Sequence, residues 1–227
     1  MKYDILLFDA DNTVLDFDAA EERALRIAFE TNGLHFDSHV LETYKRHNIR
    51  EWQRLERGEI TVEQVLVNRF VETFRELGIS PNLEAVSELY EKELHFGFNV
   101  VPHAEEVLEK LQKTCRLYIV SNGVLSIQNS RMAGSGLDKY FIKRFISEEI
   151  GIPKPSAEFF RRSFAQIEHF DCSRALIIGD SLSSDILGGI NAGIATCWFN
   201  PNGMKNKSDV KPNYEISDLR QLLNIAR

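Results

Sequence analysis

The chain has 227 residues, of which 43% are hydrophobic and 27% are charged. These fractions match those of ordinary globular proteins and exclude a disordered, collagen-like or low-complexity chain. The 34 acidic and 27 basic residues give a formal net charge of −7. Because a generic polyanion binder normally has a basic excess, this balance argues against nucleic acid as a partner. A small anionic substrate would have to be attracted by local cations.

The three cysteines, Cys115, Cys172 and Cys197, are odd in number and form no C-x-x-C pair. This argues against a disulfide framework or a zinc site and favours a reducing compartment. We expect Cys115 and Cys197 to be small buried hydrophobes in or near strands. The first apolar run stops at Asp9 after four residues, so we expect no secretory leader. No stretch approaches the roughly 18 apolar residues of a membrane span, so a cytoplasmic protein without a membrane partner is expected.

The first expected element is a strand over residues 5–8, where four consecutive apolar residues lack a helical period. A long helical block follows over residues 16–98. The first expected helix covers residues 18–32, and the second starts at the Thr61/Gln64 capping box and ends before Gly78. The third is expected to begin after Ser80-Pro81, with proline in its first turn, and to end near Gly97. Phe70 and Phe74 lie on the apolar stripe of the second of these helices.

A crossover helix needs only about a dozen residues, so a block of this length predicts a separate helical domain inserted into a sheet domain. We therefore expect a core domain of residues 1–15 and 99–227, with a helical cap of residues 16–98. Further buried strands are expected at 117–120, 175–178 and 195–199, each followed by small or polar residues. Strands that alternate with helices predict an α/β fold with a doubly wound parallel sheet, whose ligands lie beyond the carboxyl ends of the strands.

Acidic residues follow two of these strands. Asp9 and Asp11 follow the first strand, and Asp180 and Asp185 follow the run at 175–178. Each pair alone has an ordinary explanation, a polar turn for the first and a helix N-cap for the second. Together, four acids at the ends of strands in one sheet predict a hard-oxygen site suited to Mg²⁺ and a substrate phosphate.

Two segments could supply donors to a phosphate. Ser121-Asn122-Gly123 follows a strand and opens a helix, so its backbone N–H groups could hold an anion. Taken alone, however, the segment is better explained as an ordinary strand-to-helix turn. Lys154 lies between two prolines just before a helix expected to start near Ser156. Because flanking prolines restrict the backbone, they favour a fixed cation over a solvated surface lysine.

These motifs, Asp9-x-Asp11-x-Thr13, Ser121-Asn122, Lys154 and Gly179-Asp180-x-x-x-x-Asp185, resemble in content and order those of the haloacid dehalogenase superfamily of phosphohydrolases. Within it, the chain is most similar to the pyrimidine 5′-nucleotidases active on non-canonical nucleotides. The stretches that carry this similarity are Phe8-Asp9-Ala10-Asp11, Leu15-Asp16-Phe17, residues 184–193 and Ala195-Thr196-Cys197-Trp198. The helical insertion resembles the mobile cap of that superfamily.

The resemblance implies a role for each motif residue. Asp9 is the nucleophile that becomes an aspartyl phosphate, and Asp11 is the general acid and base. Mg²⁺ is bound by the side chains of Asp9 and Asp180 and by the backbone carbonyl of Asp11, and Asp185 supports the outer shell of the metal or Lys154. Ser121, the Asn122 backbone and Lys154 hold the phosphoryl oxygens, and Thr13 orients the Asp9 loop.

The expected function is a Mg²⁺-dependent phosphoric monoester hydrolase for nucleoside 5′-monophosphates such as dUMP, UMP and dTMP. Phe17, close in sequence to the nucleophile, is the expected residue to stack on the base. Alternatives are a phosphatase for phosphoglycolate or a sugar phosphate, and a phosphomutase or phosphonatase with the same chemistry. A haloalkanoate dehalogenase is disfavoured, because attack at carbon needs no acid at Asp11. A phospho-acceptor signalling module without turnover is disfavoured by the insertion after the first strand.

Overall fold

The computed structural model describes residues 2–226, and the chain divides into two compact units. Unit 1 contains the residues up to Asp16 and those from Phe98 onward, and unit 2 is Phe17–Gly97. The chain therefore leaves unit 1 soon after its first strand and returns to it once. Each unit has its own secondary structure and core, and the units are described separately below.

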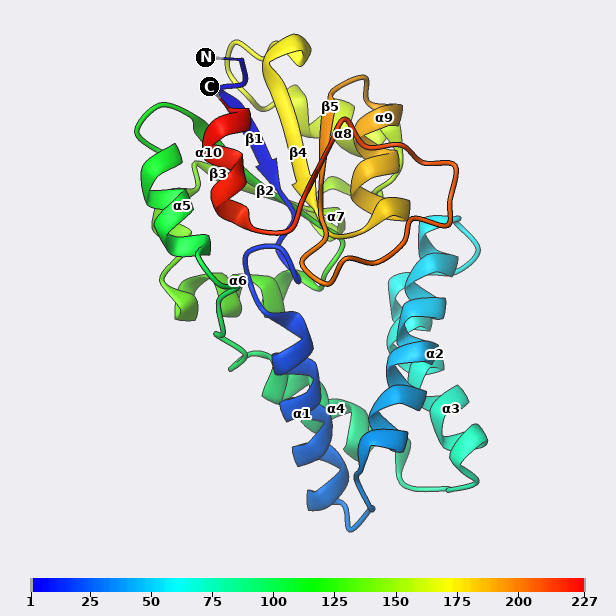
Figure 1. The fold of residues 1–227 in the computed structure, drawn as a ribbon. Coiled ribbons are helices and arrows are strands. Elements are labelled where there is room, and N and C mark those ends of the chain that lie inside the picture. Colours follow the sequence, from blue (N-terminus) through cyan, green and yellow to red (C-terminus); the bar gives the residue numbers. More distant parts are fainter. Residues whose placement is uncertain (1, 227) are drawn as a thin grey trace. The chain divides into compact units, whose positions relative to one another are not determined.

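Within residues 2–226, unit 1 has one sheet of six parallel strands in the order β3-β2-β1-β4-β5-β6 (Figure 1). The strands are β1 (Ile5–Phe8), β2 (Arg116–Ser121), β3 (Lys143–Ile146), β4 (Ala175–Gly179), β5 (Ala195–Phe199) and β6 (Tyr214–Ile216). This confirms the predicted doubly wound parallel sheet. The edge strands β3 and β6 were not predicted, because β3 begins with the partly exposed pair Lys143-Arg144 and β6 has only three residues.

The register of the central strands brings their carboxyl ends together. Strand β1 lies between β2 and β4, and its last residue, Phe8, pairs with Ile119 on one side and Ile178 on the other. Asp9 follows directly, and its N–H donates to the Ile178 carbonyl at 2.8 Å. The motifs after β1, β2 and β4 are therefore neighbours at one edge of the sheet.

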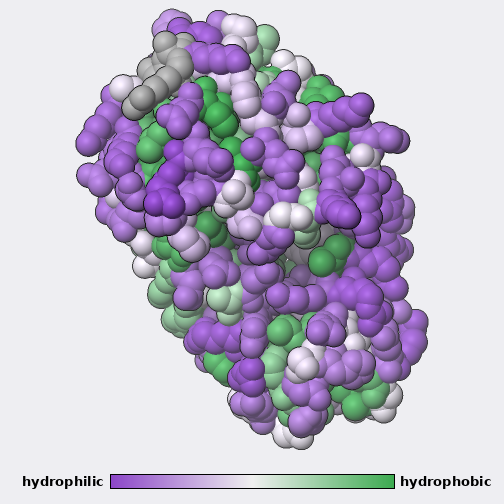
Figure 2. Space-filling view, viewed as in Figure 1, coloured by the Kyte–Doolittle hydropathy of each residue, from purple (hydrophilic) through white to green (hydrophobic). Residues whose placement is uncertain are grey.

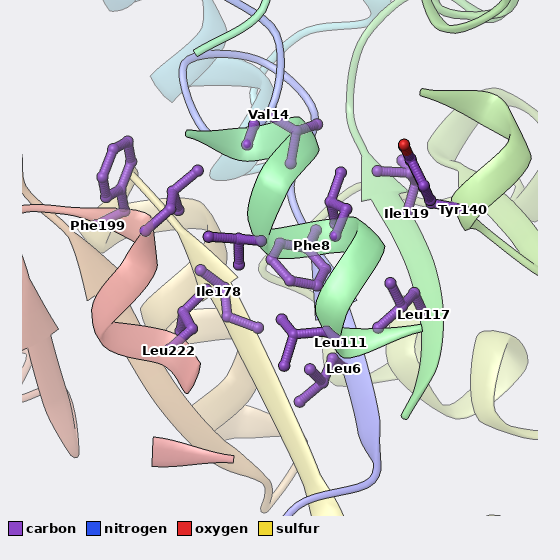
Figure 3. Packing of buried hydrophobic residues seen from close by; sticks show 14 of the residues in the cluster. Leu6, Phe8, Val14, Leu111, Leu117, Ile119, Tyr140, Ile178, Phe199 and Leu222 are labelled. Carbon is purple, nitrogen blue, oxygen red and sulfur yellow. The ribbon is translucent and has the colours of Figure 1, made fainter. Parts of the chain in front are cut away.

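Both faces of the sheet are buried, as its apolar strands require. Leu6 and Phe8 of β1 pack on one face with Leu111 of α5 and Leu222 of α10 (Figure 3). Ile5 and Leu7 of β1 face the other cluster, which includes aromatic residues of α8. The helices of unit 1 are α5 (Ala104–Leu111), α6 (Leu125–Ser135), α7 (Ser147–Ile150), α8 (Ala157–Phe164), α9 (Leu187–Asn191) and α10 (Leu222–Ile225). Cys115 and Cys197 are buried, as predicted, whereas Cys172 is exposed.

The two segments at the boundary of unit 1 pair with each other. Leu15 and Val100 form an antiparallel bridge, and the Asp16 N–H donates to the Asn99 carbonyl at 2.9 Å. The Val101 N–H donates to the Val14 carbonyl at 3.1 Å. These hydrogen bonds fix the points at which the chain leaves and re-enters unit 1.

Unit 2 is helical and consists of α1 (Phe17–Thr31), α2 (Ser38–Glu56), α3 (Val62–Leu77) and α4 (Leu83–Leu94). The predicted capping box at the start of α3 is confirmed, since Thr61 and Gln64 exchange both hydrogen bonds. Gly78 ends α3 with φ 65°, a left-handed conformation that glycine adopts without strain. Helix α4 begins after Pro81, as predicted, but Pro81 precedes the N-cap Asn82 and so lies outside the first helical turn.

Rings from three helices form the core of unit 2. Phe70 of α3 packs against Tyr44 of α2 and Tyr90 of α4, with ring centroids 5.1 and 5.4 Å away, and it also contacts Phe74. Both Phe70 and Phe74 are buried, as predicted. A polar cluster is buried in the same unit, where Asn48 donates to Glu21 at 2.8 Å.

No helix among the described residues is sufficiently long and apolar to cross a membrane. The face of the molecule in Figure 2 is predominantly hydrophilic, with hydrophobic residues scattered between polar ones.

Candidate active site

The loop after β1 places Asp9 at the edge of the sheet. The Ala10 carbonyl accepts the N–H groups of Val14 at 3.1 Å and Leu15 at 2.9 Å, which closes a tight turn. Asn12 lies within this turn at φ 54°. Asparagine tolerates the left-handed conformation better than most residues, so the sequence suits this turn locally.

Lys154 lies at the centre of the site. Its Nζ donates to Asp9 Oδ1 at 2.6 Å, to Asp185 Oδ1 at 2.6 Å and to the Val120 carbonyl at 2.9 Å. Its side chain is 2% exposed. One buried ammonium therefore connects β2 with the segments that follow β1 and β4.

The Asn122 side chain holds the backbone of Lys154. Asn122 Nδ2 donates to the Lys154 carbonyl at 2.9 Å, and the Lys154 N–H donates to Asn122 Oδ1 at 2.8 Å. From the sequence, only the Asn122 backbone was predicted to have a role in the site. The structure adds a side-chain function, which is to fix the Lys154 loop to the end of β2.

Asp180 and Asp185 follow β4, and together with Asp9 they offer carboxylate oxygens within 4.8 Å of one another. The Ser181 N–H donates to Asp185 Oδ2 at 3.1 Å, while the Ser181 side chain caps the π-helical turn Leu182–Ile186. Asp185 is therefore a partner of Lys154 in this structure, and Ser181 provides the N-cap. A Cβ atom at Gly179 would come within 2.2 Å of Asp185 Oδ2, so a glycine is needed there.

Burial and mutual repulsion dominate the electrostatics of this cluster. Burial raises the pKa of Asp9 to about 8. The nearby Lys154 opposes this rise, and the charges of Asp185 and Asp11 add to it. Burial and the nearby Asp9 and Asp185 raise the pKa of Asp180 well above its usual range. Burial alone would lower the pKa of Lys154, but Asp185 and Asp9 raise it above its ordinary value. The negative charge of these carboxylates thus exceeds the single positive charge of Lys154.

A divalent cation fits this donor set. Three carboxylates face one ammonium, and hard oxygen ligands are those that Mg²⁺ prefers. A cation among these oxygens would offset the repulsion that raises the pKa values of Asp9 and Asp180. The Asp11 carboxylate is not a member of this oxygen cluster.

The Asp11 carboxylate instead contacts two side chains of α6, Gln128 and Arg131. Gln128 Nε2 donates to Asp11 Oδ2 at 2.5 Å, and the Arg131 guanidinium forms an ion pair with Asp11 Oδ1. Gln128 Nε2 also lies 3.2 Å from Ser121 Oγ, which accepts the Gly123 N–H at 3.0 Å. Gln128 and Arg131 were not predicted from the sequence. Their i, i+3 spacing on a helix that opens at a predicted anion-binding turn was the available signal.

Thr13 and Phe17 are the remaining residues for which the sequence predicted a role. Thr13 is fully buried, and its Oγ1 has no hydrogen-bond partner among residues 2–226. The structure thus provides no hydrogen bond by which this hydroxyl would orient the Asp9 loop. Phe17 is half-buried and is the first residue of α1, so it belongs to unit 2.

Known proteins resemble the chain over nearly its full length. The model of the haloacid dehalogenase-like hydrolase family matches residues 3–193. Pyrimidine 5′-nucleotidase PynA of Streptococcus pneumoniae is 36% identical over 225 residues, which are 99% of this chain and 95% of PynA. Pyrimidine 5′-nucleotidase YjjG of Escherichia coli is 32% identical over 222 residues, 98% of this chain and 97% of YjjG.

A solved structure shares the whole fold. The crystal structure of the HAD-hydrolase YfnB from Bacillus subtilis bound to magnesium matches with a TM-score of 0.94 and 38% identity. The match covers 100% of both chains. The similarity therefore includes the helical unit 2 as well as the sheet.

Proposed function

This chain belongs to the haloacid dehalogenase-like hydrolases, and we propose that it is a Mg²⁺-dependent phosphatase acting on nucleoside 5′-monophosphates, with pyrimidines preferred. The observation that carries the proposal is the buried Lys154 ammonium, which bridges Asp9 and Asp185 beside Asp180. A carboxylate that attacks a phosphate dianion is repelled by it, so a nucleophilic Asp9 requires cations of this kind.

The proposed reaction has two displacements at phosphorus. An Asp9 carboxylate oxygen forms a bond to phosphorus as the bond from phosphorus to the leaving oxygen breaks, and the Asp11 carboxyl donates its proton to that oxygen. A water molecule then attacks the aspartyl phosphate and loses a proton to the Asp11 carboxylate. The bond between Asp9 and phosphorus breaks, which releases inorganic phosphate and regenerates Asp9.

The other residues of the site would bind the phosphoryl group and the metal. Ser121, the Asn122 backbone N–H and Lys154 are the proposed donors to the phosphoryl oxygens. Asp9, Asp180 and the Asp11 carbonyl would hold Mg²⁺, with Asp185 in support. The bound ion would neutralise negative charge on the phosphoryl group and orient it.

Support for a nucleotide substrate comes from the relatives. PynA and YjjG are named pyrimidine 5′-nucleotidases, and their similarity spans 98–99% of this chain and so extends into unit 2. We assign unit 2 as the cap that confers substrate selectivity, with Phe17 as the residue that stacks on the base. The YfnB structure is described as revealing interdomain movement, which suits a cap that closes.

The test is a panel of phosphate monoesters assayed with Mg²⁺, ranked by kcat/KM. We expect dUMP, UMP and dTMP to rank above phosphoglycolate and hexose phosphates. If a sugar phosphate or phosphoglycolate leads the panel, the nucleotidase assignment is wrong while the phosphatase assignment holds. Nucleoside release that stops at one equivalent per protein, with the phosphoryl group retained on Asp9, would instead favour the phospho-acceptor alternative. Asp9→Asn, which removes the nucleophile but keeps the shape of the side chain, is the inactive control.

A further inference from the structure

Two buried side chains of α6 contact Asp11, and we propose that Gln128 and Arg131 are positioning residues that hold its carboxylate for proton transfer. The inference rests on the proposed function, in which Asp11 gives a proton to the leaving oxygen and later takes one from water. In this scheme neither Gln128 nor Arg131 is assigned a contact with the leaving oxygen or the metal, so both act through Asp11.

Each of the two donors contacts a different oxygen of the Asp11 carboxylate. The Arg131 guanidinium pairs with Asp11 Oδ1, and Gln128 Nε2 donates to Oδ2 at 2.5 Å. The side chain of Asp11 is 27% exposed, whereas that of Arg131 is fully buried. The donors therefore approach from the protein interior, and the carboxylate retains an accessible side.

This arrangement limits the rotation of the carboxylate. The last torsion of an aspartate side chain is broad and roughly two-fold, so a carboxylate without fixed partners samples many orientations. Donors on both oxygens select one orientation. Each oxygen has more than one lone-pair direction, so Asp11 can still exchange a proton with the leaving oxygen or with water.

Gln128 also connects the acid to the phosphate-binding segment. The same Nε2 lies 3.2 Å from Ser121 Oγ, so one amide contacts both a proposed proton donor and a proposed phosphate ligand. A Cβ atom at residue 123 would come within 2.3 Å of Gln128 Nε2. Because Gly123 has no side chain, there is room for the Gln128 amide at this position.

A purely structural role explains Arg131 less well. A buried guanidinium destabilises a protein unless it is paired, and an apolar side chain of similar volume is often as stabilising. Its neighbour on α6, Met132, is such an apolar residue and packs in the hydrophobic core. The ion pair with Asp11 explains why a charged residue stands at position 131, since the guanidinium orients the Asp11 carboxylate.

The test compares two leaving groups. A nucleoside 5′-monophosphate releases an alkoxide that needs the proton from Asp11, whereas p-nitrophenyl phosphate releases a stable phenolate that does not. General acid catalysis contributes about 10²–10⁴-fold. We expect Arg131→Met to lower kcat/KM for dUMP by about 10²-fold, and kcat/KM for p-nitrophenyl phosphate by less than about threefold. Arg131→Lys, which keeps a cation, should recover part of the dUMP activity.

Gln128→Met is the second variant, because it removes no charge and remains testable if Arg131→Met does not fold. It should lower the ratio of dUMP to p-nitrophenyl phosphate kcat/KM in the same direction. A moderate loss common to both substrates is expected in addition, because Gln128 also contacts Ser121. Met132→Ala is the matched control, since it creates a cavity on the buried face of the same helix and leaves the contacts of Asp11 in place. It should lower the urea midpoint and leave the substrate ratio unchanged.

Equal losses on the two substrates in folded variants, with an active wild type, would overturn the positioning role and leave the phosphatase assignment intact. If the wild type hydrolyses another alkyl phosphate instead of dUMP, the nucleotide assignment is wrong and the same ratio is measured with that ester. A wild type with no monoester turnover would overturn the proposed function itself.

Discussion

The stability of unit 2 should depend on pH through one buried carboxylate. Glu21 of α1 is 2% exposed and accepts a hydrogen bond from Asn48 Nδ2 at 2.8 Å. Lys45 Nζ lies 3.9 Å from its other oxygen. Burial raises the pKa of Glu21 from 4.5 to about 7, because Lys45 only partly offsets the loss of solvation.

The direction in which stability changes with pH follows from the number of protons bound in the folded and unfolded states. Between the two pKa values the folded state binds more protons than the unfolded state, so stability falls as the pH rises from 4.5 through about 7. At 1.36 kcal/mol per pKa unit, the difference corresponds to about 3 kcal/mol. Most of that loss, roughly 2–3 kcal/mol, should fall between pH 5 and pH 8.

The perturbation is Glu21→Gln, which keeps the shape and removes the ionisation. We expect the variant to gain about 2–3 kcal/mol relative to the wild type between pH 5 and pH 8. The assay is urea unfolding followed by the fluorescence of Trp52, the only tryptophan in the sequence of unit 2. Both proteins should carry Trp198→Phe, so that the signal comes from unit 2.

The matched control is Glu22→Gln, which removes the same charge from the same helix at a side chain that is 46% exposed and pairs with Arg26. Its stability difference from the wild type should change by less than about 1 kcal/mol over this range. Parallel pH–stability curves for Glu21→Gln and the wild type would show that ionisation of Glu21 does not destabilise unit 2. They would mean that water or a cation compensates the ionised Glu21.

Further predictions concern the metal, its supports and the core of unit 2. Asp180→Asn should weaken Mg²⁺ binding more than Asp11→Asn, whose side chain lies outside the oxygen cluster; equal losses by calorimetry would contradict this division. Trp198→Phe removes the indole N–H that donates to the Asp180 carbonyl at 2.8 Å, and should lower Mg²⁺ affinity by about 10-fold in the same titration. Phe70→Ala should destabilise unit 2 by about 3–5 kcal/mol in urea, because Phe70 is fully buried; a loss below about 1 kcal/mol would contradict the described packing.

Much of the local structure could be predicted from the sequence. The apolar run of β1, the capping box at Thr61 and the stop at Gly78 are short-range signals, and each lies where it was expected. Helix α2 was missed because its buried face includes polar residues such as Asn48 and Glu51. These residues find partners on other helices, so they interrupt the apolar period that identifies a helix.

The motifs of the site were also recognisable, because each occupies a few consecutive residues whose types suit phosphate or metal. The positions of these motifs relative to one another could not be predicted from the sequence. Lys154 reaches Asp9 across 145 residues of chain, and Arg131 reaches Asp11 across 120. The i, i+3 spacing of Gln128 and Arg131 places them on one face of α6, but it does not indicate that this face is turned toward Asp11.

The class of fold, the family and the residues able to carry the chemistry depend on local patterns, so they could be predicted from the amino-acid sequence. Three contacts could be seen only in the folded chain: Lys154 is shared by Asp9 and Asp185, Asn122 holds the Lys154 backbone, and Asp11 has partners on α6. These contacts depend on the strand order. Placing β1 between β2 and β4 brings distant segments to one edge of the sheet, and local propensities do not encode that order.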